Sequence, residues 1–230
     1  QMIGHPGLDS EWIKQLNINR NINVKPKAIK IIKCLVLSRK FLPMNVKRSG
    51  GLDPGILEFD AVVRFFKLIE HSLKETGKQY KITVKPHPSS SYPENIRALR
   101  KAGIKNFDIS YEPFFKLLPE SDLVITEFST SIAFSVLANI PTILLNSSLQ
   151  SYVHNSWIKL EKLYSGLRYY VKNPKKDLPK IVASVIDELN DSNFDITRSN
   201  LDVEHFRNFY EDNAISRALK RTKFLLNERS

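Results

Sequence analysis

Two stretches of the chain decide its predicted fold: residues 80–88 read Tyr-Lys-Ile-Thr-Val-Lys-Pro-His-Pro, and residues 121–131 read Ser-Asp-Leu-Val-Ile-Thr-Glu-Phe-Ser-Thr-Ser. In each stretch an apolar, strand-length run ends in a small polar cluster. Ligands of open α/β sheets bind at the carboxyl ends of the strands. The second cluster also opens a predicted helix, whose free backbone N–H groups and dipole favour an anion. The two stretches therefore predict a phosphate-binding site at one edge of a sheet.

Strand-length and helix-length segments alternate along the chain from residue 28 onward. Strands are predicted at residues 31–38, 81–84, 107–109, 123–126, 141–145 and 167–171. Helices are predicted, from apolar residues at helical spacing and from their flanking Gly and Pro residues, at 11–16, 56–76, 93–102, 113–118, 129–138, 176–189, 203–210 and 214–227. Repeated strand–helix units predict an α/β fold with a Rossmann-like parallel sheet and helices on both faces.

The bulk composition is that of an ordinary globular protein. The chain has 230 residues, of which 42% are hydrophobic and 26% charged. Its longest apolar runs are strand-sized, well short of the roughly 20 residues that span a membrane. The single cysteine, Cys34, lies in the first predicted strand and excludes an internal disulfide framework. We expect Cys34 to pack in the core and the protein to be cytoplasmic.

The chain carries a formal net charge of +11, from 35 Lys and Arg against 24 Asp and Glu. Such a surface attracts polyanions, including nucleic acids, anionic lipids and phosphorylated substrates. The positive charge is scattered along the chain, and neither an RNA-binding aromatic signature nor a zinc-finger spacing accompanies it. We therefore expect no nucleic-acid partner, and peripheral attraction to the inner face of the membrane is the stronger expectation.

The first candidate site segment is Lys85-Pro86-His87-Pro88, at the end of the second predicted strand. The two prolines hold His87 in a stiff, extended loop, because proline fixes its own φ and restricts the residue before it. An imidazole can donate to a phosphate oxygen and titrates near neutral pH. The same four residues are equally compatible with a rigid turn that carries an incidental histidine.

The second candidate segment contains Glu127, Ser129, Thr130 and Ser131. The three hydroxyls and their backbone N–H groups would donate to a phosphate, and the small residues that follow keep the predicted helix slim enough to approach the sheet. One hydroxyl is also explained as a simple helix cap. Glu127 would pair with a ligand hydroxyl or act as a favourable charge at the start of the helix.

Three further charged residues follow predicted strands. Arg39 and Lys40 end the first strand, where they would counter phosphate charge or form a solvated strand end. Glu112 follows the third strand and would accept a ribose hydroxyl or start a helix. The chain has no His-Glu-x-x-His helix, no Walker-type loop and no Gly-x-Ser-x-Gly elbow, so we expect neither a metal cofactor nor a hydrolase.

In this order, the motifs resemble the C-terminal, donor-binding domain of GT-B-fold glycosyltransferases. The resemblance rests on a linker-like segment at 3–9, on His87-Pro88, on 121–131 with the following Ile-Pro-Thr-Ile at 140–143, and on the closing segment 210–226. The His-Pro and Ser/Thr motifs are similar to those of bacterial sialyl-, polysialyl- and Kdo transferases of capsule and lipopolysaccharide assembly, and of CDP-glycerol (teichoic acid) transferases.

This resemblance implies a transferase of bacterial surface polysaccharide biosynthesis. Its donor would be a nucleotide-activated sugar, CMP- or CDP-linked, and its acceptor a glycan or a lipid-linked molecule. His87, Ser129, Thr130 and Ser131 would hold the donor nucleotide and phosphate. His87 would be the catalytic residue, stabilising or protonating the departing phosphate. No metal and no cofactor besides the donor substrate are implied.

The resemblance also implies a domain organisation. Residues 1–27 would be an interdomain linker with a short helix, residues 28–200 the donor-binding domain, and residues 201–230 helices that pack toward a partner domain. The sialyltransferase branch takes its base from an acidic Asp/Glu-Asp/Glu-Gly triplet of the N-terminal domain, whereas here Glu211-Asp212 precedes Asn213. We therefore expect the acceptor domain and the catalytic base to lie outside this chain.

Three alternative functions remain open on the sequence. A UDP-GlcNAc 2-epimerase-like isomerase would use the same fold with a uridine nucleotide. A non-catalytic basic module would bind polyanions or a membrane face without nucleotide specificity. A degenerate transferase domain would fold and serve as a scaffold without binding a nucleotide.

Overall fold

The computed structural model describes residues 29–44, 58–88, 90–127, 131, 132, 135, 138, 140–145 and 169–191. The strands are β1 (Ile31–Leu37), β2 (Gln79–Lys85), β3 (Phe107–Ile109), β4 (Leu123–Thr126), β5 (Thr142–Leu145) and β6 (Tyr170–Val171). The helices are α2 (Phe59–Lys74), α3 (Tyr92–Lys101), α4 (Phe114–Leu117), the 3₁₀ helix η2 (Leu118–Glu120) and α7 (Pro174–Asn190).

The six strands form one sheet in the order β3-β2-β1-β4-β5-β6, and every pair of neighbours is parallel. The chain therefore builds outward from β1 to β3 and then returns to add β4 on the other side of β1. This reversal between β1 and β4 is the topological switch point of a doubly wound sheet, where ligands of such folds bind. The predicted Rossmann-like α/β fold is confirmed.

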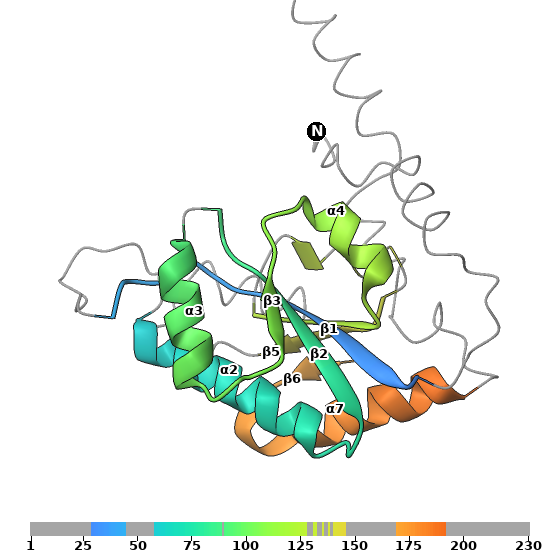
Figure 1. Ribbon diagram of the computed structural model, residues 1–230. Coiled ribbons are helices and arrows are strands. Elements are labelled where there is room, and N and C mark those ends of the chain that lie inside the picture. Colours follow the sequence, from blue (N-terminus) through green and yellow to red (C-terminus); the bar gives the residue numbers. More distant parts are fainter. Residues whose placement is uncertain are drawn as a thin grey trace, which may run out of the picture.

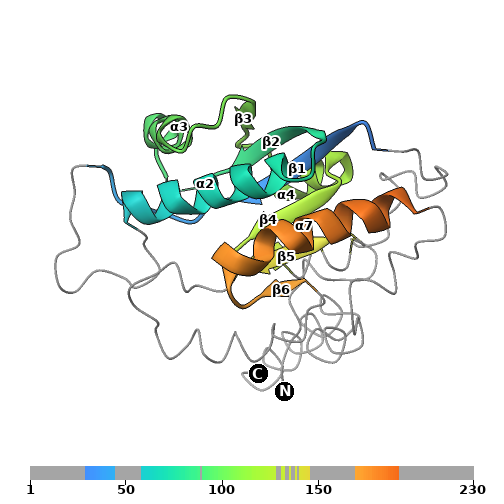
Figure 2. The same ribbon diagram turned by 90° about the horizontal axis from the view of Figure 1, so that it is seen from below.

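Helices cover both faces of the sheet. On one face α2 packs against α3 and α7, and Figure 2 shows α2 and α7 side by side across the strands. On the opposite side of the strands lies α4 (Figure 1), which continues directly into η2. The parallel connections require this arrangement, because each crossover leaves the sheet, covers one face and re-enters with the same hand.

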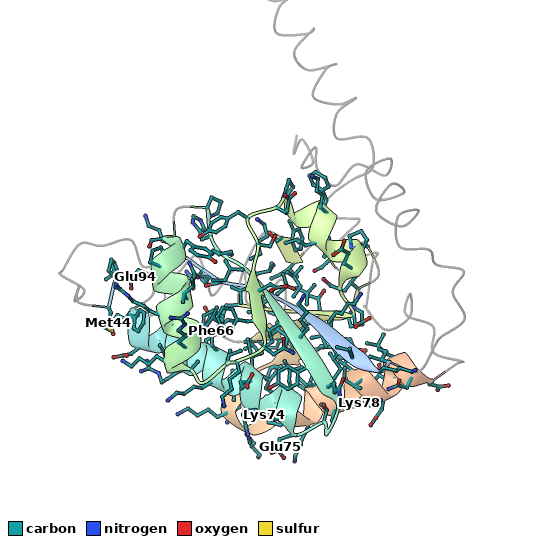
Figure 3. All side chains as sticks on the ribbon, viewed as in Figure 1. Met44, Phe66, Lys74, Glu75, Lys78 and Glu94 are labelled. Carbon is teal, nitrogen blue, oxygen red and sulfur yellow. The ribbon has the colours of Figure 1, made fainter. Side chains whose placement is uncertain are left out.

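The core has two layers because successive side chains of each strand point to opposite faces. In β1, Cys34 and Val36 belong to the larger apolar cluster under α2, α3 and α7, whereas Leu35 and Leu37 belong to the smaller one under η2. Phe66 of α2 is fully buried at the centre of the larger layer (Figure 3). The prediction that Cys34 packs in the core is confirmed, and its burial raises the pKa of its thiol.

Strand positions agree closely with the sequence prediction. The bounds of β3 and β4 are those predicted, and β1 ends one residue earlier, at Leu37. Two predictions of length were wrong. Strand β2 also includes residues 79, 80 and 85, because their backbone pairs with β1. Strand β6 comprises Tyr170–Val171 and is preceded by a turn at Tyr169, whereas residues 167 and 168 of the predicted strand lie outside the described residues.

Helix ends follow the local chemistry of the chain. Ser91 caps α3 by accepting a bond from the backbone N–H of Glu94 at 3.4 Å. The glycines after α2 and α3 take left-handed backbone angles, with φ of 66° at Gly77 and 84° at Gly103. Glycine adopts this conformation without a Cβ penalty, so both positions end a helix. Among the residues of the predicted helix 129–138, Ser131, Ile132 and Ser135 are helical.

Several predictions lie outside the described residues. These are the helices 11–16, 203–210 and 214–227, the segments 1–27 and 201–230 of the proposed domain organisation, and residues Ser129 and Thr130. Within the described part of the chain, no helix has the length and apolar character needed to span a membrane.

Candidate functional site

The register of three neighbouring strands aligns the candidate segments at one edge of the sheet. Leu37 of β1 pairs with Lys85 of β2 and with Thr126 of β4. The residues that follow are therefore level with one another, and the backbone N–H of Ser38 still donates to the carbonyl of Lys85 at 3.0 Å. Predicted site residues from three separate stretches thus meet beside the switch point.

An ion pair crosses the switch point itself. Arg39, after β1, lies with its Nη1 3.6 Å from Oε2 of Glu127, after β4. The Glu127 side chain is 2% exposed and that of Arg39 is 12% exposed. A carboxylate that is so deeply buried requires a compensating cation. Glu127 therefore offsets the charge of the Arg39 guanidinium, a role that the sequence did not indicate.

The segment Arg39-Lys40 is anchored on both sides. Ser38 before it is bonded to β2, and Phe41 after it is buried, with its ring 6.1 Å from the ring of Phe59 in α2. Farther along, the backbone N–H of Met44 donates to Glu94 of α3 at 3.3 Å (Figure 3). The two basic residues are thus held at the carboxyl edge by the core.

His87 lies in the loop between buried Pro86 and exposed Pro88. The loop is closed by a bond of 2.8 Å from the backbone N–H of Ser90 to the carbonyl of His87. Partial burial lowers the pKa of the His87 imidazole, and the nearby positive charges of Lys40 and Arg39 lower it further. The strand register brings Arg39, Lys40 and His87 to the same edge of the sheet, and we call these three residues the basic cluster.

Lys85 is the last residue of β2 and is partly buried, which lowers the pKa of its ammonium group. Its backbone carbonyl joins β2 to the start of the basic segment through Ser38. This bond uses the backbone, and binding of a ligand by the Lys85 side chain stays a prediction.

Glu112 is turned toward α4. Its carboxylate pairs with Lys116 at 3.1 Å, one helical turn later, and its backbone N–H donates to Ser110 Oγ at 3.2 Å. It lines a cavity of about 550 Å³ between α4 and the strands, where Lys81 and Asp108 are also paired, at 2.6 Å. The contacts of Glu112 are thus those of a residue at the start of a helix.

Among the predicted hydroxyl donors, Ser131 is half-buried and helical, while Ser129 and Thr130 lie outside the described residues. The predicted close approach of this segment to the sheet is supported by Ser135. Its hydroxyl is fully buried and accepts a bond of 2.8 Å from Thr142 of β5. Only a small residue permits such proximity of helix and strand.

Sequence reasoning did not single out two tyrosines at the same edge. Tyr92 begins α3, Tyr111 follows β3, and their ring centroids are 6.3 Å apart. Tyr111 Oη donates to the backbone carbonyl of Ser90, in the His87 loop, at 3.3 Å. Both tyrosines lie between a strand and a helix, as His87 does. This position in the sequence was the signal that could have identified them as candidate site residues.

The described residues contain no group of three or more His, Cys, Asp or Glu side chains able to hold a metal ion. The candidate site comprises Arg39, Lys40 and His87, with Glu127 paired to Arg39. Three fixed positive or proton-donating groups at the carboxyl ends of strands can bind and stabilise an anion such as a phosphate.

Comparison with known proteins yields matches among solved structures alone, since no protein-family model and no curated protein sequence matches the chain. One structure of the wall teichoic acid polymerase TagF, a variant soaked with CDPG, superposes with a TM-score of 0.44 and 14% identity over 89% of this chain. A second TagF structure covers the whole chain with a TM-score of 0.39 and 19% identity. A trehalose-6-phosphate synthase covers 81% with a TM-score of 0.41 and 13% identity.

The chain spans about half the length of these proteins or less: 42% and 50% of the two TagF chains and 43% of the synthase.

Proposed function

We propose that this chain is the donor-binding half of a glycosyltransferase that uses a nucleotide-activated sugar, with CMP or CDP as the leaving group. The observation that carries the proposal is the meeting of Arg39, Lys40 and His87 at the carboxyl edge of β1 and β2, directly beside the switch point. This is the place where a doubly wound sheet binds a nucleotide. The cluster supplies the positive charge that a phosphate requires.

In this proposal the basic cluster stabilises the phosphate as the bond to the sugar breaks. Arg39, paired with Glu127, and Lys40 offset the negative charge that develops on the leaving group. Fixed charges act strongly there because they need no reorganisation during the reaction. The neutral imidazole of His87 donates a hydrogen bond and, when protonated, transfers its proton to the departing oxygen. The hydroxyls of Ser129, Thr130 and Ser131 complete the phosphate site.

The remaining components belong to other parts of the enzyme. A catalytic base and the acceptor, a glycan or a lipid-linked molecule, would be held by a partner domain that faces the carboxyl edge. Glu112 is paired with Lys116 in the structure. We propose that the Glu112 carboxylate also accepts a bond from a ribose hydroxyl of the donor. The net charge of +11 favours action at an anionic membrane surface, where acceptors for surface polysaccharide synthesis are assembled.

Calorimetric titration with CMP, CDP, UMP, UDP and GDP tests the proposed function. We expect a cytidine nucleotide to bind selectively and His87→Ala to lose at least tenfold in affinity, about 1.4 kcal/mol, while its thermal unfolding is unchanged. His71→Ala is the matched control, because His71 is an exposed histidine of α2 with a side chain 61% exposed. It should bind as the wild type does.

Two results would contradict this proposal. Preferential binding of UDP, together with epimer formation from a UDP-sugar, would identify an isomerase. Absence of binding by all five nucleotides to the folded chain would leave a polyanion-binding or scaffold domain as the better description.

A further inference from the structure

Large apolar side chains are exposed at the same edge of the sheet as the basic cluster. In the described part of the chain, the exposed large apolar residues other than Ile31 are Met44, Tyr92, Tyr111 and Phe115. Each of the four follows the carboxyl end of β1, β2 or β3 or begins the helix after it. Apolar side chains that gather on a surface, rather than lying singly, mark binding sites.

Tyr92 and Tyr111 form the ordered centre of this surface. Their side chains remain 51% and 47% exposed, although their rings contact each other with centroids 6.3 Å apart and planes inclined by 46°. The pair is tied to the backbone, because Tyr111 Oη donates to the carbonyl of Ser90 at 3.3 Å. Two half-exposed aromatic rings are thus held in a defined arrangement at the edge of the sheet.

The aromatic pair lies directly beside the basic cluster. Ile109 of β3 pairs with Val84 of β2, so Tyr111 is level with Pro86, the residue before His87. The backbone carbonyl of Ser90 accepts the bond from Tyr111, and the backbone N–H of Ser90 donates to the carbonyl of His87. Neighbouring strands are about 4.8 Å apart. Tyr111 is therefore one strand from His87 and two strands, roughly 10 Å, from the end of β1 that Arg39 follows.

We infer that Tyr92 and Tyr111 form the surface on which the base of the bound nucleotide stacks, an inference that rests on the proposed function. The edge presents cationic groups on β1 and β2 and aromatic rings on the β3 side. The complementary ligand has an anionic end and a flat, uncharged aromatic end. A nucleotide has this construction, with the ribose between its phosphate and its base. Bases stack on tyrosine rings without any requirement for a particular base edge.

This assignment gives the two parts of the site different functions in binding. The basic cluster binds the phosphate and does not distinguish CMP from ribose 5-phosphate, which lacks only the base. The aromatic pair contributes affinity only when a base is present. Stacking on one aromatic side chain changes binding by about 1–3 kcal/mol, which corresponds to roughly 5- to 150-fold in affinity.

The test is calorimetric titration of the full 230-residue chain with CMP and with ribose 5-phosphate. The variants are Tyr92→Leu and Tyr111→Leu, which replace the ring by an aliphatic side chain, and Tyr111→Phe, which keeps the ring and loses the bond to Ser90. We expect wild type to bind CMP at least fivefold more tightly than ribose 5-phosphate. Each leucine variant should lose about 5- to 150-fold for CMP and less than twofold for ribose 5-phosphate. Tyr111→Phe should retain most of the CMP affinity.

Each other outcome overturns the inference in a recognisable way. Equal affinity of wild type for CMP and ribose 5-phosphate excludes a base-stacking surface while leaving the phosphate site in place. Unchanged CMP binding by both leucine variants shows that the base is bound elsewhere and leaves the proposed function intact. An equal loss for both ligands assigns the tyrosines a structural role in the His87 loop. Failure of wild type to bind either ligand overturns the proposed function together with this inference.

Discussion

At the scale of single residues, the most consequential contact is the ion pair of Arg39 with Glu127. Burying a carboxylate at 2% exposure is unfavourable unless a cation accompanies it. The pair lies at the switch point, where the order of strand addition reverses between β1 and β4. A guanidinium paired with a buried carboxylate would lose less rotamer entropy on binding an anion than a freely rotating arginine would.

Replacing Glu127 by Gln should destabilise the chain, because it leaves the nearly buried charge of Arg39 without its counter-ion. Removal of one partner of a buried pair costs about 3 kcal/mol. The measurement is urea denaturation of wild type, Glu127→Gln, Arg39→Gln and the double variant. We expect the double variant to be more stable than the sum of the single losses predicts, by roughly 0.5–3 kcal/mol. Strictly additive losses would show that the two side chains do not interact.

The lowered pKa of His87 gives a second residue-scale prediction. The folded state disfavours the protonated imidazole, so between the folded-state pKa and the unfolded value near 6.5 the unfolded chain binds more protons. The contribution of His87 to stability is therefore lost as the pH falls through 6.5 toward the folded-state pKa, and is constant below it.

Unfolding experiments at pH 8, 6 and 5 check this sign. His87→Asn should gain stability relative to wild type as the pH falls. Lys40→Gln should have a weaker pH dependence than wild type in the same range, because it removes one of the charges that lower the pKa of His87. A His87→Asn variant that keeps a constant difference from wild type at all three pH values would show that His87 titrates alike in both states.

At the scale of secondary-structure elements, local signals were sufficient for most of the fold. Strand β4 has four buried apolar or hydroxyl residues in succession, and such a run identifies a strand in the middle of a parallel sheet. Gly77 and Gly103 end helices because they occupy left-handed backbone angles. Strand β2 was predicted too short because polar Gln79 and Lys85 interrupt the apolar run at its two ends, and their pairing with β1 makes them part of the sheet.

The candidate site was predictable only in part, for a reason of topology. That His87 and Arg39 both follow strands is visible in the sequence. That Arg39 meets Glu127 depends on β4 lying beside β1, and strand order is not encoded in any local pattern. Tyr92 and Tyr111 likewise come together only because the start of α3 and the end of β3 lie at the same edge of the sheet. Residues that depend on strand order were therefore missed or assigned a different partner.

At the scale of the whole molecule, one sheet separates two apolar layers of unequal size. The larger layer contains Phe66 of α2, and the smaller one contains Leu118 of η2 beneath Leu35 and Leu37. Strands of the sheet contribute side chains to both layers. The basic cluster lies at the carboxyl ends of these strands. We therefore expect the geometry of the phosphate site to depend on the whole sheet. Weaker packing on either face should destabilise the entire structure.

Truncation of one residue in each layer tests this dependence. Phe66 and Leu118 are both fully buried, so Phe66→Ala should lower the free energy of unfolding by about 3–5 kcal/mol and Leu118→Ala by about 2–5 kcal/mol. Lys67→Ala, an exposed position next to Phe66 on α2, is the control and should change it by less than about 0.5 kcal/mol. If the layers form one cooperative unit, each variant unfolds in a single transition, with circular dichroism and fluorescence giving the same midpoint. Separate midpoints in Leu118→Ala would instead mean that the α4 side of the sheet opens independently, and the site would then have to be understood as resting on the larger layer alone.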